Sequence, residues 1–133
     1  MNSDFPSAEE YASEKARFGA LDVLDIQALQ REATAPYSNQ VMLDFNGNCM
    51  RMAVFKGDYR WHMHPSSDEI FLVVEGELHI EFDAAPERVL RPWQAITVPA
   101  GTVHRTRAVG RTVNLTFEQQ AAETVFVGPP AGG

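Results

Sequence analysis

The feature that most constrains the fold is a run of short segments in which apolar and polar residues alternate, separated by turns rich in glycine, proline, asparagine and aspartate. Alternation with a period of two is typical of a strand with one buried face. No helical stretch separates these segments, as a parallel sheet would require. The pattern predicts an all-β protein, a sandwich or barrel of antiparallel strands. The expected strands are residues 41–45, 49–55, 59–64, 69–74, 78–82, 88–90, 95–98, 103–109 and 111–118, with a turn at Gly110.

The first 35 residues have a helical pattern instead. Ser7 is a suitable cap for a first helix that Gly19 can end, and Asp25 can cap a short second helix. Pro36 then stops helical structure, because it lacks a backbone donor. We therefore expect an N-terminal helical or extended segment (1–35), a barrel (36–127) and a loose tail (128–133).

The composition excludes several classes of partner. Eighteen acidic residues against eleven basic ones give a formal charge of −7, with no run of Lys or Arg, so we expect no nucleic acid or anionic membrane as partner. No apolar run approaches the roughly 18 residues that a membrane span needs. The N-terminus lacks the basic and apolar parts of a signal peptide, and Cys49 is the one cysteine. The predicted location is the cytoplasm.

Two histidines and a glutamate lie close together in the stretch WHMHPSSDE. Side chains two apart on a strand share a face, so His62 and His64 project together. A turn follows, and an antiparallel neighbour can bring Glu69 beside them. Imidazoles and a carboxylate are a common ligand set for divalent first-row metals. His104, after a Pro-Ala-Gly-Thr turn, offers a third imidazole.

These residues also resemble a known family. H-x-H-x4-E-x6-G is the first cupin motif, here His62, His64, Glu69 and Gly76, and P-x-G-x2-H of the second motif ends at His104. The chain is most similar to small cytoplasmic cupins labelled mannose-6-phosphate-isomerase-like. The resemblance implies a double-stranded β-helix (jelly-roll) with one divalent transition metal ion per chain, which could be Fe, Mn, Ni, Zn or Cu. It implies that the ligands are His62, His64, Glu69 and His104.

Two positions depart from the family pattern. Trp93 stands where a glycine is usual, and Ala108 stands where an asparagine often follows the last histidine by four. Neither is a ligand position, so the predicted ligands are unchanged. A single strand histidine is more often structural than a ligand, but the second motif favours metal binding. His79 shares its face with two glutamates, which predicts a surface position.

Four further residues are candidates for contact with a substrate. Arg60 shares the ligand face and could bind a carboxylate or phosphate, or could extend into solvent instead. Phe71 and Met52 could give the cavity an apolar lining, although such residues are often only core, and Thr106 shares the face of His104. In the strand 111–118 either face could point inward.

Two functions fit this pattern. The first is a metalloenzyme acting on a small polar metabolite, as an isomerase, a lyase or decarboxylase, or a dioxygenase. The second is a non-catalytic module that binds a sugar or an organic acid. No carboxylate besides Glu69 has both motif context and inward parity, so the pattern favours the enzyme only modestly. We also expect a homodimer that uses the first strands, with the N-terminal helix packing on its own barrel or across the two-fold axis.

Overall fold

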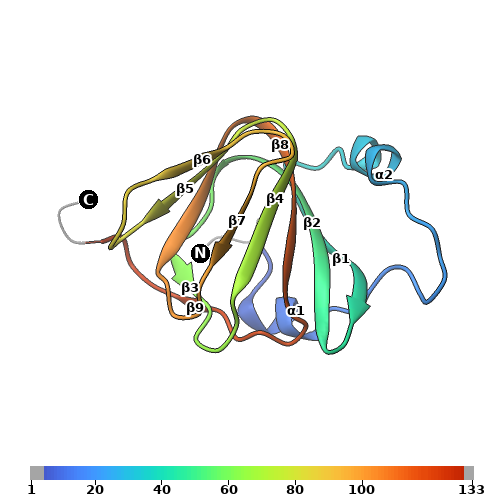
Figure 1. The fold of residues 1–133 in the computed structure, drawn as a ribbon, viewed down its shortest axis with the longest axis horizontal. Coiled ribbons are helices and arrows are strands. Elements are labelled where there is room, and N and C mark those ends of the chain that lie inside the picture. The colour runs from blue at the N-terminus through green and yellow to red at the C-terminus, as the bar shows by residue number, and fades with distance from the viewer. Residues whose placement is uncertain (1–4, 131–133) are drawn as a thin grey trace.

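Two short helices and nine strands make up the part of the chain described by the computed structural model, residues 5–130 (Figure 1). No helix in this range is long and apolar enough to cross a lipid bilayer. The elements are α1 (Ala8–Ser13), α2 (Ile26–Glu32), β1 (Tyr37–Phe45), β2 (Asn48–Asp58), β3 (His62–Met63), β4 (Glu69–Glu75), β5 (Leu78–Phe82), β6 (Arg88–Leu90), β7 (Ala95–Val98), β8 (His104–Gln119) and β9 (Val125–Phe126).

The strands form one curled antiparallel sheet with β8 at its centre. β8 pairs with β2, β3, β4 and β5 at different points along its length, while β7 joins β4 and β6 joins β5. The sheet folds over on itself, so that its two halves enclose an interior (Figure 1). The predicted all-β fold of the double-stranded β-helix type is confirmed.

The predicted turn at Gly110 is wrong, because β8 continues through this residue. The register with β2 pairs Phe55 with Thr112 but Gly57 with Ala108, so three residues of β8 lie opposite Lys56 alone. A bulge of this kind bends a strand without reversing it. The bend allows one long strand to serve both halves of the sheet.

The strand predicted over residues 59–64 is much shorter than expected. Only His62 and Met63 form β3, which lies between β8 and β9 at one end of the barrel. His62 pairs with His104 on one side and with Phe126 on the other. β9 was not predicted, since two residues are too few to show a periodic pattern.

α1 begins where the sequence predicts and ends earlier. Ser7 caps it, with its hydroxyl accepting from the backbone N–H of Glu10 at 3.2 Å. The helix ends at Ser13 instead of continuing to Gly19, because the carboxylate of Glu14 turns to accept from the backbone N–H of Val41 at 2.8 Å. The chain then runs beside β1, where the N–H of Arg17 donates to the carbonyl of Val41 at 2.9 Å. Tertiary contacts with β1 have replaced the helix.

The core is in two parts, one on each side of β2. The barrel interior holds Phe55, Phe71, Val73, Leu78 and Ile80 with their neighbours. The outer cluster packs α2 against the barrel and holds Met42, Met50, Met52, Val54, Val113 and Leu115 together with Leu29. Because β2 is buried on both faces, its residues alternate between these two cores.

Candidate metal centre

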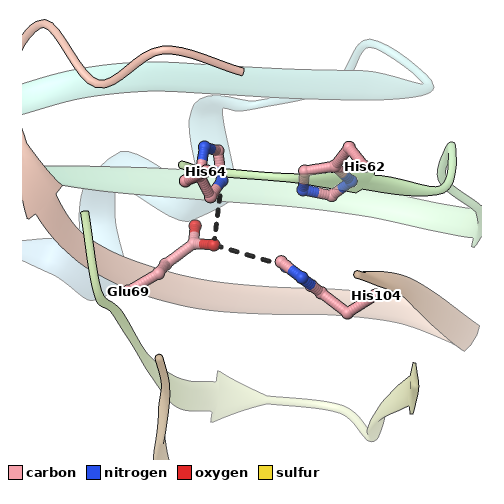
Figure 2. A group of neighbouring side chains, drawn as sticks. All are labelled: His62, His64, Glu69 and His104. Atoms are coloured by element: carbon pink, nitrogen blue, oxygen red, sulfur yellow. Dashed lines mark ion pairs between the residues drawn. The ribbon is translucent and has the colours of Figure 1, made fainter. Parts of the chain in front are cut away.

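The structure brings together the four side chains that the motifs singled out. His62 lies directly opposite His104 on β8, His64 follows β3, and Glu69 opens β4. One ligand atom from each of the four lies within 4.8 Å of the others, and all four residues are buried. Figure 2 shows the three rings and the carboxylate converging on one point inside the barrel.

Backbone carbonyls orient all three rings. Nδ1 of His62 donates to the carbonyl of Arg60 at 2.7 Å, Nδ1 of His64 to that of Glu123 at 3.1 Å, and Nδ1 of His104 to that of Thr102 at 2.8 Å. Because Nδ1 carries the proton in a neutral ring of this kind, Nε2 presents a lone pair to the cavity.

These lone pairs require a cation between them. Nε2 of His64 lies 3.2 Å from Oε1 of Glu69, and Nε2 of His104 lies 3.5 Å from the same oxygen. Both Oε1 of Glu69 and Nε2 of His104 lack a hydrogen-bond partner within residues 5–130. Acceptor atoms that face one another while buried are destabilising unless a proton or a metal ion lies among them.

The pKa values of the cluster depend on burial and on the charges of its other members. Burial and then the neighbouring His104 lower the pKa of His62 to about 3, so this ring stays neutral. Burial alone would lower the pKa of His64, but the negatively charged carboxylate of Glu69, 3.2 Å from its Nε2, raises it to about 9. Burial opposes ionisation of Glu69, yet its histidine partners hold its pKa well below the ordinary value. A proton on His64 thus occupies the place that a metal ion would take.

The donor set fits a divalent transition metal. Three imidazole nitrogens and one carboxylate oxygen are borderline ligands that suit Fe, Mn, Ni, Zn or Cu. Four ligands converge from three segments of the chain, and hydrogen bonds to the backbone fix each ring. The unpartnered atoms of Glu69 and His104 are the ones that an ion would satisfy.

His79 lies outside this cluster. Its Nε2 approaches Oε2 of Glu77 at 2.7 Å, and its Nδ1 approaches Oε2 of Glu87 at 2.9 Å. Arg107 also reaches Glu87, at 3.1 Å. His79 is therefore part of a network of charged groups on the outer face of β5, although its side chain is only 14% exposed.

The cluster opens on a cavity of about 70 Å³. Phe71 and Thr106 line it, so both lie where the sequence predicted. Met52 does not, because it faces the outer core beneath α2. The predicted inward position of Arg60 is also corrected. Arg60 is exposed, and its guanidinium stacks on the ring of Phe126 at 3.7 Å from the centroid.

The ambiguous strand 111–118 is resolved with its polar face inward. Asn114, Thr116 and Glu118 line the cavity, while Val113 and Leu115 pack in the outer core. Glu118 is the carboxylate that sequence reasoning missed. Its side chain is 8% exposed, and burial together with the charge of Glu69 raises its pKa to about 8. The available signal was its shared parity with Asn114 and Thr116.

A second missed group closes the cavity from the N-terminal side. Arg51 is 4% exposed and binds Oε1 of Glu14 at 2.9 Å and the carbonyl of Tyr11 at 2.7 Å. The hydroxyl of Tyr11 lies 2.7 Å from that of Tyr37 and 2.9 Å from that of Tyr59. The segment that carries α1 therefore supplies part of the cavity wall.

Fold and site together define a double-stranded β-helix with a buried three-histidine, one-glutamate cluster, and comparison with known proteins agrees. Residues 50–117 match the model of the Cupin domain. A protein described as uncharacterized protein YdbB, from Bacillus subtilis (strain 168), is 45% identical over 103 residues, which is 77% of this chain and 91% of that protein. The chain belongs to the cupin family.

Solved structures show the same fold. A cupin-2 domain containing protein from Shewanella frigidimarina superposes with a TM-score of 0.67 at 23% identity, over 71% of this chain and 92% of that chain. An oxalate oxidase superposes with a TM-score of 0.54 at 27% identity, over 61% of this chain and 46% of that chain. The mannose-6-phosphate-isomerase-like subgroup remains a prediction.

Proposed function

We propose that this protein is a metal-dependent enzyme that acts on a small polar metabolite. The observation that carries the proposal is the position of Glu118, a buried carboxyl group beside the four-residue cluster in the same cavity. Sequence reasoning favoured an enzyme only modestly because it found no general base there. Glu118 supplies a proton-transfer group, and this supports an isomerase or lyase type of reaction over a dioxygenase.

The residues of this chain divide the work between them. His62, His64, Glu69 and His104 would hold a divalent transition metal ion, which when bound polarises a substrate oxygen. Glu118 would accept or donate a proton at its carboxyl oxygens. Phe71 and Phe55 keep part of the wall apolar, and the segment carrying Tyr11 restricts the access of water.

The cavity limits the size of the substrate. At about 15 Å³ for each water-sized position, a cavity of about 70 Å³ has room for only a few heavy atoms. We also propose a cytoplasmic location, on the basis of the acidic composition and the single cysteine.

Glu118→Gln tests the proposal, because it removes the proton-transfer group and keeps the shape. Wild-type protein reconstituted with metal is screened against a panel of small hydroxy and keto acids and short sugars. We expect kcat to fall roughly a hundredfold or more in Glu118→Gln, with metal content unchanged. Glu75→Gln, at an exposed carboxylate on β4, is the matched control.

Two outcomes would contradict the proposal that this protein is an enzyme. Unchanged turnover in Glu118→Gln would remove this residue from the chemistry. Stabilisation of the wild-type protein by a panel compound, with no turnover of any compound, would favour the alternative of a non-catalytic binding module.

A further inference from the structure

Arg51 on β2 has more hydrogen-bond donors than the fold uses. A guanidinium carries five N–H groups. Nη1 donates to Oε1 of Glu14 at 2.9 Å and to Oδ1 of Asn39 at 3.2 Å, and Nη2 donates to the carbonyl of Tyr11 at 2.7 Å. Within residues 5–130 this leaves one N–H of Nη2 and the N–H of Nε without an acceptor. Arg51 lines the cavity, and its Nε is not among the unpartnered atoms that are sealed from solvent, so a small molecule can reach it.

The tyrosine hydroxyls beside Arg51 also have one proton to spare. The guanidinium lies over the ring of Tyr11, 5.2 Å from its centroid. Tyr59 donates to the hydroxyl of Tyr11 at 2.9 Å, and a second hydrogen bond of 2.7 Å joins Tyr11 and Tyr37. Two hydrogen bonds among three hydroxyls use two of the three protons. The third proton, on Tyr11 or Tyr37, has no acceptor in the described part of the chain, and all three tyrosines line the same cavity.

Three unused donors at one end of a cavity fit a group that only accepts hydrogen bonds. A carboxylate is such a group, and its hydrogen bonds with a guanidinium are among the stronger ones in proteins. An amide or an ammonium group would bring more donors instead. Water can occupy the place in the free protein, but it carries no charge to complement Arg51.

The charges around Arg51 leave room for an anion on the cavity side. Glu14, its ion-pair partner, has a side chain 29% exposed, so water screens its charge. The nearest carboxyl group on the cavity side is that of Glu118. Its Oε2 lies 3.8 Å from Nε of Arg51, which is too far for a hydrogen bond.

This end of the cavity is next to the histidine cluster. The ring of Tyr59 packs edge-on against that of His62, with 5.3 Å between centroids. Glu118 is close to Arg51 on one side and contacts Glu69 on the other. Because a single side chain separates Arg51 from the cluster, a compound of a few heavy atoms can contact Arg51 and extend toward the cluster.

We propose that Arg51 and the spare tyrosine hydroxyl form a carboxylate-binding subsite, so that the substrate is a small carboxylic acid. This inference rests on the proposed function and names its substrate class. Three N–H groups of Arg51 hold Glu14, Asn39 and Tyr11, and the remaining two bind the ligand. The carboxylate lies at the N-terminal side of the cavity, and the other atoms of the acid point toward the cluster.

Acetate and acetamide are matched probes for this subsite. Each has four heavy atoms in the same planar shape, and only the amide adds N–H donors. By NMR titration of the metal-free wild-type protein, we expect acetate to bind roughly tenfold more tightly than acetamide. Leaving out the metal removes coordination as a source of this preference. Equal affinity for the two probes would overturn the proposal.

Arg51→Lys tests the residue itself in the zinc-loaded protein. Lysine keeps a positive charge near Glu14 but cannot present the two N–H groups of Nε and Nη2. We expect the Kd of acetate to rise roughly tenfold, with zinc content and circular dichroism unchanged. Arg107→Lys is the matched control, because Arg107 pairs with Glu81 and Glu87 outside the cavity, and acetate affinity should stay the same.

Unchanged acetate affinity in a folded Arg51→Lys variant would also overturn the proposal, because the carboxylate would then be recognised elsewhere. If that variant does not fold, the comparison of acetate with acetamide on the wild type decides. Neither measurement depends on turnover. Loss of turnover in Glu118→Gln without a preference for acetate would therefore overturn the subsite and leave the enzyme, whereas a preference for acetate without turnover of any compound would support the subsite in a binding module.

Discussion

At the scale of single residues, the backbone orients the cluster before any metal binds. The carbonyls of Arg60, Thr102 and Glu123 each hold one imidazole, so the Nε2 atoms converge without an ion. A preorganised site binds more tightly, because little rotamer entropy is lost on binding. The same arrangement makes each ring necessary, since the fold offers no nearby replacement among the described histidines.

The first prediction concerns metal content. His62→Ala, His64→Ala and His104→Ala should each reduce the metal that copurifies with the protein by roughly tenfold or more, because each removes one of four ligands. His79→Ala should keep full content, since its ring binds Glu77 and Glu87 on the outer face. Elemental analysis of freshly purified protein measures both. Loss of metal from the His79 variant alone would contradict the assignment and would point to a different site.

At the scale of elements, the turn between β4 and β5 depends on Gly76. Its φ is +89°, and a Cβ here would lie 2.6 Å from Oγ1 of Thr112 and 2.7 Å from the carbonyl oxygen of Arg111. Both strain and overlap therefore oppose any side chain. The Thr112 hydroxyl also accepts from the N–H of Glu77 at 3.2 Å, so β8 holds this turn directly.

The second prediction follows from that contact. Gly76→Ala should lower the free energy of unfolding by about 3 kcal/mol or more. Gly101→Ala is the control, because Gly101 has a φ of +79° but open space around its Cβ position. It should cost only about 1–2 kcal/mol from the backbone conformation. Urea unfolding measures the difference, and equal losses would show that the contact with β8 contributes nothing.

Trp93 takes a left-handed backbone conformation in another turn, although it is not a glycine. It occupies the position where the family usually has glycine, and it takes the glycine conformation, with a φ of +68°. Its N–H donates to the carbonyl of Val73 at 2.7 Å, so β4 holds the strained backbone in place, while its ring is largely exposed. The turn geometry thus persists without the glycine.

At the scale of the whole molecule, the N-terminal segment closes one end of the barrel (Figure 1). Phe5 packs edge-on against Tyr37 and Tyr59, and Glu14 binds Arg51 in the cavity wall. This segment therefore contacts its own barrel, which is the first of the two arrangements considered from the sequence. It also covers part of the outer edge of β1.

The third prediction concerns assembly. We propose a homodimer that uses the first strands and the loop between α1 and α2. In that loop Leu21 and Val23 are 101% and 93% exposed, so a partner would remove apolar surface from water. Light scattering at micromolar concentration should give twice the 14.8 kDa mass of one chain. The double variant Leu21→Ser and Val23→Ser should weaken pairing, and a wild-type monomer would refute the prediction.

The sequence by itself determined the fold class and the four clustered residues. Alternation in residues 69–82 predicts which side chains face the barrel, and Phe71, Val73, Leu78 and Ile80 do so. In this segment local geometry is enough, since one face is buried and the other is more open. The spacing of His62 and His64 likewise puts both on one side, but Glu69 is not on a strand paired with theirs, as the sequence suggested. β3 and β4 each pair with β8 instead, and the curling of the sheet around β8 brings Glu69 to the two imidazoles.

Only the tertiary structure decided which face of β2 and of the second half of β8 lines the cavity. Both strands are buried on both sides, so alternation shows which residues share a face but not which face is inward. For this reason alternation wrongly assigns Met52 to the cavity, and it does not reveal that Arg51 and Glu118 line the cavity. A charged residue in a strand is expected at the surface. Arg51 is buried because the carboxyl groups of Glu14 and Glu118 lie 2.9 Å and 3.8 Å from its guanidinium. Burial and the charge of Glu69 raise the pKa of Glu118 to about 8, so its carboxyl group can be buried in the neutral form.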